Sequence, residues 1–313
     1  MSKTRVLFIS GVGRSGSTLI ERTLGTDPRI VVLGEVTHLW ERSLVMDELC
    51  GCGQPFSACP FWQAVGQRAF GGWHNIDARA VIATRAELDR VSRTPRSGPG
   101  LGPAAYRRKL RDYGALYAKL YRAAAEVAGA EVVVDSSKQP SVPYVLRHQK
   151  DLDLRVLHCI RDSRAVALSW TKTVNRPEAQ TESFGTMTRY SPAKLSVVWL
   201  AHNLAAAATR LTGAPVKTLR YEDWTEKPEE GTAEILRFCG LHPSSPEAMS
   251  DGTVTLVLNH TCSGNPLRFT TGEVKIRMDE RWRTELPSHS KRLVGALTLP
   301  LLRTFGYVGG RRG

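Results

Sequence analysis

The chain has 313 residues, of which 42% are hydrophobic and 23% charged, close to ordinary globular usage. This length and composition exclude a collagen, a peptide toxin and a mini-protein, and allow one large domain or two small ones. Subtracting 30 acidic from 43 basic residues leaves a net charge of +13, which attracts anionic partners such as nucleic acid, anionic lipid or a polyphosphorylated cofactor.

Strand and helix patterns alternate along the chain. Buried strands are predicted where β-branched apolar runs occur, at Arg5 to Ser10, Ile30 to Leu33, Glu131 to Asp135, Arg155 to Ile160 and Val216 to Arg220. Amphipathic spacing predicts helices at Ser17 to Leu24, Ala104 to Val127, Arg164 to Thr173, Ala193 to Leu211 and Glu229 to Cys239. This alternation predicts a three-layer α/β/α fold with a central parallel sheet and ligand sites at the carboxyl ends of its strands.

The pattern shows neither an internal repeat nor a domain linker, so a single domain over residues 1–313 is expected, with insertions around 36–103 and 171–192. Arg93 to Pro103 carries too many Pro and Gly for regular structure, and Asn175 to Pro192 is polar. We interpret the first as a mobile loop and the second as a lid, with solvated connectors as the alternative for both. No stretch reaches the roughly 18 to 20 apolar residues that a membrane span needs, so a soluble, cytoplasmic protein is expected.

A Gly-rich segment, GVGRSGST from Gly11 to Thr18, follows the first predicted strand and opens the first predicted helix. Free backbone N–H groups and the positive end of the helix dipole at such a place bind phosphate. A nucleoside triphosphatase has Lys where this chain has Ser17. Here the cation is Arg14, inside the loop, which argues against hydrolysis of ATP or GTP. A Gly/Ser turn without a ligand is the alternative.

A second cationic position follows the predicted strand that ends at Ile160. Arg161 leaves the sheet at its ligand edge, and Ser169 lies two helical turns further on. An Arg offers a planar fork of donors, and together with a hydroxyl it can bind a second phosphate. One nucleoside with phosphates at both its 5′ and 3′ positions would satisfy two such sites. A surface ion pair of Arg161 with Asp162 is the alternative.

Cysteine usage predicts reduced thiols, because six Cys in a chain of this length is a low density. Cys50, Cys52 and Cys59 form a C-x-C-x6-C cluster, but a structural zinc site has a fourth ligand and different spacing. We interpret the three as packed thiols in a loop. If a metal does bind, His74 is the nearest candidate for the fourth ligand.

The two phosphate-binding segments, GRSGST and IRDSRAVALS, together resemble the PAPS-dependent sulfotransferases. In that family the first segment binds the 5′-phosphosulfate and the second the 3′-phosphate of 3′-phosphoadenosine 5′-phosphosulfate. The resemblance implies a P-loop sulfotransferase fold like that of nucleoside triphosphate hydrolases, 3′-phosphoadenosine 5′-phosphate as a product, and no metal. It implies that the cofactor is bound by Gly13, Arg14, Ser15, Gly16, Ser17, Thr18, Arg161 and Ser169.

Two further matches imply catalytic roles. Leu33-Gly34-Glu35 resembles the segment that carries the catalytic Glu in the tyrosylprotein branch of the family. Lys138-Gln139-Pro140 resembles that branch's Lys-Asp-Pro, whose Lys lies at the sulfuryl group. The resemblance thus implies that Glu35 takes the acceptor's proton, while Arg14 and Lys138 stabilise charge on the departing phosphate.

Later matches imply further cofactor ligands. Leu219 to Asp223 is similar to the family's Arg-Tyr-Glu-Asp strand end, where the Tyr, here Tyr221, lies by the nucleotide. His260 to Gly272 and Asp279 to Trp282 resemble the segment that closes over the cofactor in bacterial members. In that segment the cytosolic group has Arg-Lys-Gly, whereas here three residues separate Arg268 and Gly272, the two implied ligands.

The pattern lies closer to the tyrosylprotein branch than to the cytosolic aryl and steroid enzymes. Those enzymes have Lys in the phosphosulfate loop and a catalytic His after a middle strand, whereas this chain has Arg14 and no His in Asp135-Ser136-Ser137-Lys138. A His-base mechanism is therefore not expected. Asp135, His38 and His260 remain competing candidates for the base, and Asp135 could equally cap the helix that follows it.

The expected activity is sulfuryl transfer to a hydroxyl, or less favourably an amine, of a small-molecule, glycan or glycolipid acceptor. A P-loop kinase of small molecules or nucleotides, using ATP and Mg²⁺, is the alternative, and Ser17 argues against it. No nucleic-acid partner is expected, because the basic residues are distributed along the chain apart from a short cluster at Arg107 to Arg111. The charge leaves peripheral contact with an anionic membrane open, and the sequence does not define the oligomeric state.

Overall fold

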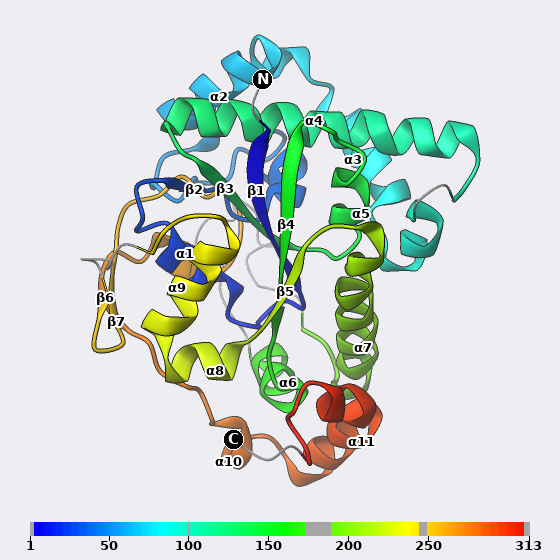
Figure 1. Cartoon of the computed structure of the whole chain (residues 1–313), viewed down its shortest axis with the longest axis vertical. Helices are drawn as coiled ribbons and strands as arrows, with labels where there is room; N and C mark the ends of the chain where they lie inside the picture. Colours follow the sequence, from blue (N-terminus) through cyan, green and yellow to red (C-terminus); the bar gives the residue numbers. More distant parts are fainter. Residues whose placement is uncertain (1–2, 99–100, 173–188, 244–248, 310–313) are drawn as a thin grey trace.

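The computed structural model describes residues 3–98, 101–172, 189–243 and 249–309. Its main sheet has five parallel strands in the order β2-β3-β1-β4-β5 (Figure 1). They are β1 (Thr4–Gly11), β2 (Ile30–Val32), β3 (Val132–Lys138), β4 (Leu152–Ile160) and β5 (Val216–Arg220). All five predicted strands are confirmed; β3 continues to Lys138 rather than ending at Asp135, and β4 begins at Leu152 rather than Arg155. The α/β fold class is therefore correct.

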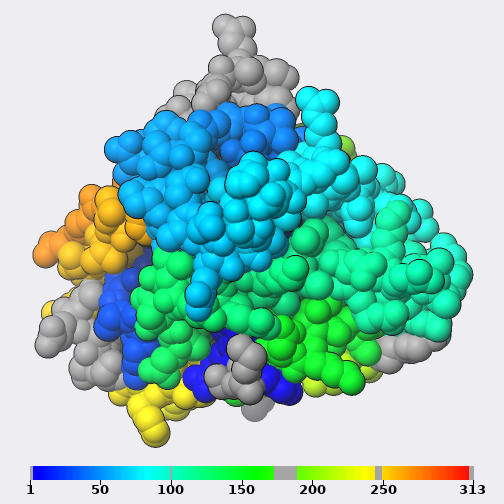
Figure 2. Space-filling view, turned by 90° about the horizontal axis from the view of Figure 1, so that it is seen from above, coloured from blue at the N-terminus to red at the C-terminus, as the bar shows by residue number. Residues whose placement is uncertain are grey.

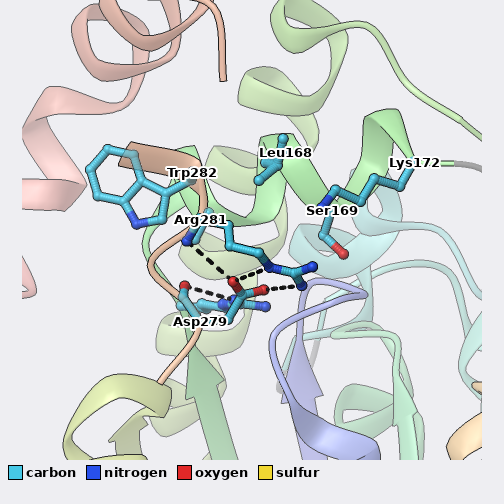
Figure 3. A pocket seen from close by; sticks show the side chains of 8 residues that line it. Leu168, Ser169, Lys172, Asp279, Arg281 and Trp282 are labelled. Atoms are coloured by element: carbon cyan, nitrogen blue, oxygen red, sulfur yellow. Dashed lines mark hydrogen bonds and ion pairs between the residues drawn. The ribbon is translucent and has the colours of Figure 1, made fainter. Parts of the chain in front are cut away.

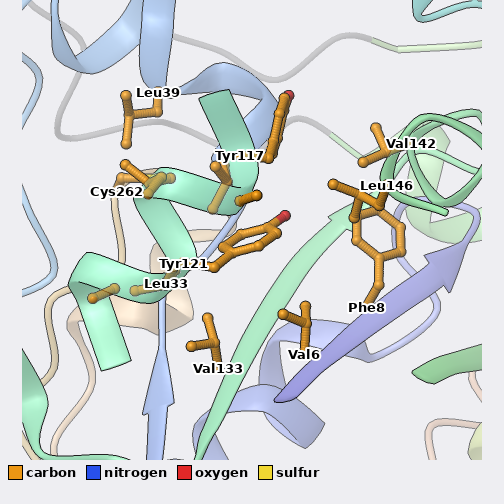
Figure 4. Packing of buried hydrophobic residues seen from close by; sticks show 14 of the residues in the cluster. Val6, Phe8, Leu33, Leu39, Tyr117, Tyr121, Val133, Val142, Leu146 and Cys262 are labelled. Atoms are coloured by element: carbon orange, nitrogen blue, oxygen red, sulfur yellow. The ribbon is translucent and has the colours of Figure 1, made fainter. Parts of the chain in front are cut away.

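Helices cover both faces of this sheet because successive strand residues point to opposite sides. Val6 and Phe8 of β1 pack with α4 (Ala104–Ala128) and α5 (Val142–Leu146) in a cluster that Figure 4 shows from close by. Leu7 and Ile9 pack on the other face, against residues of three helices. These helices are α1 (Ser17–Leu24), α8 (Tyr221–Glu226) and α9 (Pro228–Phe238). Strands buried on both faces explain the nearly continuous apolar runs in the sequence.

Further helices pack around these layers. They are α2 (Pro60–Phe70), α3 (Ala78–Leu88), α6 (Ser163–Thr171), α7 (Pro192–Ala208), α10 (Trp282–Glu285) and α11 (Ser288–Thr304). Short helical turns occur at Val36–His38, Leu39–Ser43, Phe56–Ala58, Trp73–Asn75, Val91–Ser97, Thr209–Thr212 and Pro266–Phe269. A small antiparallel sheet, which the sequence analysis missed, contains β6 (Met249–Ser250), β7 (Thr253–Leu256) and β8 (Gly272–Lys275).

The structure describes most of the first predicted loop and little of the second. The expectation that the 93–103 segment has no regular structure is wrong for its first part, because Val91–Ser97 forms a 3-10 helix with Pro95 inside it. A 3-10 helix tolerates Pro there because so short an element has few N–H groups to satisfy. Most of the predicted lid, residues 175–188, lies outside the described residues. Among the residues described, no helix combines the length and the apolar character needed to cross a membrane.

Residues 36–98 form a cover over one end of the molecule. Figure 2 shows their blue and cyan atoms gathered on this face, next to the green of α4. Trp40 and Trp62 are fully buried there and belong to the same core cluster as the tyrosines of α4. This segment therefore shares its core with the sheet.

The strand order places two loops at the middle of the sheet's carboxyl edge. The chain leaves β1 toward β2 on one side, and leaves β4 toward β5 on the other. In open α/β sheets ligands bind at such a topological switch point. Because Gly11 of β1 is paired with Cys159 of β4, the loop 12–16 and the residues after Ile160 emerge beside each other.

Candidate functional site

The loop between β1 and α1 is tightly constrained. Gly16 has φ +83°, and a Cβ on it would lie 2.1 Å from a ring carbon of Tyr221, so only glycine fits. Arg14 also has a positive φ, 72°, which is uncommon for a residue with a side chain. The backbone N–H groups of residues 13–18 donate no hydrogen bond to any of the described residues. This is the geometry of an anion-binding loop at a helix N-terminus.

Arg14 brings a cation to that loop. Its Nε and Nη2 atoms are buried, and no group in the described part of the chain forms a hydrogen bond with them. Burial lowers the pKa of Arg14, while the negative charge of Glu35 opposes that change. The guanidinium carbon lies 5.8 Å from the ring centre of Trp170, whose Nε1 donates to the carbonyl of Gly13. Since buried donors are normally satisfied, an anionic ligand is the expected partner of these two nitrogens.

Arg161, directly after β4, lies against the same loop. Its Nη1 donates to the carbonyl oxygen of Arg14 over 3.2 Å, and its guanidinium carbon lies 5.0 Å from the ring centre of Tyr221. Its Nη2 approaches Asp279 Oδ2 at 3.4 Å. The sequence analysis required Arg14 and Arg161 to be close enough for one nucleotide to reach both. The direct contact between them meets that requirement.

A pocket opens beside Arg161. Ser169 of α6 lines it, together with Asp279 and Arg281 from the segment before α10 (Figure 3). It contains about 230 Å³ of space, part of it open to solvent. The residues that line it are Arg161, Ala165, Leu168, Ser169, Lys172, Asp279, Arg281 and Trp282. Three cations and one carboxylate make this pocket suited to an anion.

Glu35 and Lys138 form an ion pair close to this loop. Glu35 follows β2, and Lys138 is the last residue of β3, where φ is +64°. Lys138 Nζ donates to Glu35 Oε1 over 2.6 Å, and each side chain is only 12% exposed. Burial by itself would raise the pKa of Glu35. The neighbouring Lys138, followed by His38 and Arg42, outweighs this effect and lowers the pKa to about 2. Glu35 is therefore a carboxylate at neutral pH.

A second segment holds Glu35 from the opposite side. The Glu35 backbone N–H donates to the carbonyl of Ser263 over 3.2 Å, and Arg42 donates to the Ser263 hydroxyl over 2.9 Å. Gly34 has φ +81°, and a Cβ on it would lie 2.7 Å from the same Ser263 carbonyl. Glycine before Glu35 is therefore a packing requirement. Part of the 260–272 segment that the resemblance identified thus covers Glu35.

The competing base candidates have different surroundings. His38 Nε2 lies 3.5 Å from Glu35 Oε2, and burial lowers the pKa of His38 to about 3, so its imidazole is neutral. Asp135 is fully buried and accepts hydrogen bonds from Tyr121 and Ser137. Burial raises the pKa of Asp135 to about 6. The alternative that Asp135 caps the next helix is wrong, because α5 has Ser141 at that position.

Three other predicted residues lie away from the pocket of Figure 3. Arg268 is 1% exposed and donates to the carbonyls of Thr261 and Leu49, an arrangement that argues against a role as phosphate ligand. Gly272 begins β8 and pairs with Leu256 in the small sheet. His260 has its Nδ1 3.3 Å from Cys59 Sγ.

The sequence analysis missed Lys172 as a pocket residue and His260 as the partner of the cysteines. Lys172 lines the pocket one helical turn after Ser169, and the (i, i+3) spacing on one helix face was a usable signal. Cys50, Cys52 and Cys59 converge on His260. The suggestion of His74 as their fourth partner is wrong, because His74 is not part of this group. No spacing rule identifies a partner that lies some two hundred positions away.

Comparisons with known proteins identify the family. Residues 4–286 match a family model described as the sulfotransferase domain. No curated protein sequence matches the chain significantly.

Three solved structures are among those similar to this chain. The sulfotransferase domain from the Synechococcus PCC 7002 olefin synthase is 18% identical, with a TM-score of 0.49 over 96% of this chain and 95% of that chain. The sulfotransferase domain from the curacin biosynthetic pathway is 16% identical, with a TM-score of 0.46 over 95% and 98%. A sulfotransferase from Alicyclobacillus acidocaldarius is 14% identical, with a TM-score of 0.37 over 95% of each chain.

Proposed function

The chain belongs to the sulfotransferase family, and we propose that it transfers the sulfuryl group of 3′-phosphoadenosine 5′-phosphosulfate to an acceptor hydroxyl by in-line displacement. The observation that carries the choice of donor is the contact between Arg161 and the Arg14 carbonyl, 3.2 Å. It brings two cationic subsites within reach of one nucleotide that has phosphates on two of its positions.

The donor would be bound by groups from three elements. The backbone N–H groups of 13–18 and the Arg14 guanidinium would bind the 5′-phosphosulfate, because these N–H groups and the Nε and Nη2 atoms of Arg14 have no partner within the described part of the chain. Arg161 and Ser169 would bind the 3′-phosphate in the pocket of Figure 3. Tyr221 packs under Arg161 and against Gly16, so it would fix the distance between the two subsites.

When bound, this donor supplies an activated sulfuryl group, which leaves its phosphate and joins the acceptor oxygen. Negative charge then grows on the bridging oxygen of the phosphate, as in phosphoryl transfer. Arg14 and Lys138 would stabilise that charge, each by a few kcal/mol when well aligned. The Lys138 ammonium has three donors, and Glu35 uses one of them. The other two have no partner among the described residues and would bind an anionic oxygen.

Glu35 would accept the proton of the attacking hydroxyl. With a pKa of about 2 it is ionised but weakly basic as long as Lys138 is bound to it. Charge that develops on the leaving group draws Lys138 away from Glu35, and the pKa of Glu35 then rises toward the value that its burial favours. The carboxylate would thus become a stronger base at the moment when the proton must leave.

The acceptor would approach Glu35 from the side covered by residues 36–98. His38 and Arg42, which both lower the pKa of Glu35, come from this segment. A hydroxyl acceptor fits a carboxylate base better than an amine does, because an amine is already protonated at neutral pH. The acceptor class stays as the sequence suggested: a small molecule, a saccharide or a lipid.

The test compares two isomeric nucleotides. 3′-phosphoadenosine 5′-phosphate and adenosine 5′-diphosphate have the same atoms and differ in where the second phosphate sits. We expect the first to bind at least about tenfold more tightly, since one charge-assisted hydrogen bond contributes about 1.5–3 kcal/mol. Ser169→Ala should reduce the ratio of the affinities for the two nucleotides. Equal affinities, or a larger thermal shift with ATP and Mg²⁺, would favour a kinase and contradict the proposal.

A further inference from the structure

Four side chains from two distant parts of the sequence converge at one place in the fold. Cys50, Cys52 and Cys59 come from the segment before α2, and His260 comes from the segment that covers Glu35. Their three sulfur atoms and one imidazole nitrogen all lie within 4.8 Å of one another. We refer to these four residues as the Cys-His corner.

The distances in the Cys-His corner match those of a tetrahedral metal site. Zn–S bonds of about 2.3 Å in a tetrahedron put neighbouring sulfurs about 3.8 Å apart. Here Cys52 Sγ and Cys59 Sγ are 3.8 Å apart, and His260 Nδ1 lies 3.8 Å from Cys50 Sγ and 3.3 Å from Cys59 Sγ. The cysteines are free thiols, well beyond the length of an S–S bond.

The four side chains are buried or only partly exposed. Cys50 and Cys59 are buried, and the His260 ring stacks on Phe61 with centres 4.9 Å apart. Three uncharged thiols packed for their volume alone would not need an imidazole nitrogen aimed at them.

We propose that Cys50, Cys52, Cys59 and His260 bind one Zn²⁺ ion in a closed, structural site. Three thiols and a neutral imidazole form the Cys₃His set that Zn²⁺ prefers, and no coordination position remains for a substrate. On binding, three Zn–S bonds and one Zn–N bond form, and the thiol protons pass to solvent. The ion takes part in no electron transfer.

The site would fasten the segment around Cys50 to the segment that covers Glu35. Three hydrogen bonds already join the two: Gly51 N–H to the Thr261 carbonyl at 2.9 Å, Arg268 Nη2 to the Leu49 carbonyl at 2.6 Å, and Trp62 Nε1 to the His260 carbonyl at 2.7 Å. His260 is three residues from Ser263, whose carbonyl accepts the Glu35 N–H. Loss of the metal should therefore loosen the support of Glu35 without removing any group that touches the reactants.

The first experiment measures metal in the intact wild-type protein, purified without chelators, by inductively coupled plasma mass spectrometry. We expect about one zinc per chain. Protein produced with Co²⁺ should show thiolate-to-cobalt charge transfer and the intense visible bands of a tetrahedral ion. Metal far below one per chain that added Zn²⁺ does not restore would overturn the proposal. So would a mass lower by two thiol hydrogens, which marks a disulfide.

The second experiment compares Cys59→Ala with Cys262→Ala. Both cysteines are fully buried, and each substitution removes the same atom, but Cys262 lies outside the Cys-His corner. We expect Cys59→Ala to lose at least tenfold in zinc affinity and Cys262→Ala to keep one zinc per chain. Equal metal content in the two variants would contradict the assignment. If Cys59→Ala does not fold, the cobalt spectrum of the wild type still decides.

Discussion

Two regions of this sulfotransferase use buried polar groups in opposite ways. At the carboxyl edge of the main sheet, Nε and Nη2 of Arg14 are buried and have no hydrogen-bond partner among the described residues. Arg161 lines an open pocket beside them. In the Cys-His corner, four atoms that can bind a metal ion lie within 4.8 Å of one another. The first arrangement fits a ligand that arrives and leaves, and the second fits an ion that stays.

The difference follows from what each region contributes to stability. A buried donor without a partner costs free energy in the folded state, which ligand binding can recover. A closed set of thiolates around a metal instead stabilises the fold that brings it together. The effects of mutations on transfer and on stability should therefore separate between the two regions.

The largest effect on transfer is expected from Arg14→Ala. Losing a cation aimed at the developing charge should lower kcat/KM by about 10²–10³-fold. Stability should stay equal or rise, because burial lowers the pKa of this guanidinium and so disfavours its charged form. Steady-state kinetics and thermal denaturation of the same preparation test both parts. A clear fall in the melting temperature, with zinc content unchanged, would contradict the idea that Arg14 serves the ligand and not the stability of the fold.

A smaller effect, visible in the pH profile, is expected from Lys138→Met. In the wild type the pKa of Glu35 is about 2, so Glu35 stays ionised and kcat/KM should show no acidic limb from it between pH 5 and 8. Without Lys138, burial dominates and raises this pKa, so activity should fall as the pH is lowered through the new value.

Glu35→Gln is the matched control for this profile. Its kcat/KM should be about 10²-fold lower than that of the wild type, and the pH profile should show no acidic limb. An unchanged profile in Lys138→Met, or full activity in Glu35→Gln, would place the base elsewhere.

The smallest effect on transfer is expected from Glu21→Gln, which should instead alter how stability depends on pH. Burial raises the pKa of Glu21 to about 7, although Ser136 and the Gly34 N–H donate to it. Above the unfolded value of about 4.3 the unfolded chain releases this proton first, so stability should fall as the pH rises from about 4.3 to 7.

Urea denaturation across that range should show a slope that is flatter in Glu21→Gln by at most one proton. Asp89 and Asp135, whose pKa values burial raises to about 6, keep part of the slope in both proteins. Identical slopes would mean that Glu21 is already ionised in the folded state.

Most of the sheet could be predicted because its signals are local. A run such as Val132 to Val134 is apolar because both its faces are buried. In the loop after β1, Gly16 has a positive φ and the ring of Tyr221 beside it, so this glycine is a local signal. Arg161 could be placed at the ligand edge because it directly follows a predicted strand. The small sheet was missed because its strands have two to four residues, too few to show a period.

The sequence by itself determined the α/β fold, the Gly-rich loop at Gly11 to Thr18 between a strand and a helix, and the place of Arg161 directly after a strand. Each of these depends on residues that are neighbours in the chain. Only the tertiary structure decided that Lys138 holds Glu35 ionised while Asp135, three positions before Lys138, has a raised pKa. It also brought His260 to the three cysteines. Burial and charge act through space, and the fold alone decides which distant residues share that space.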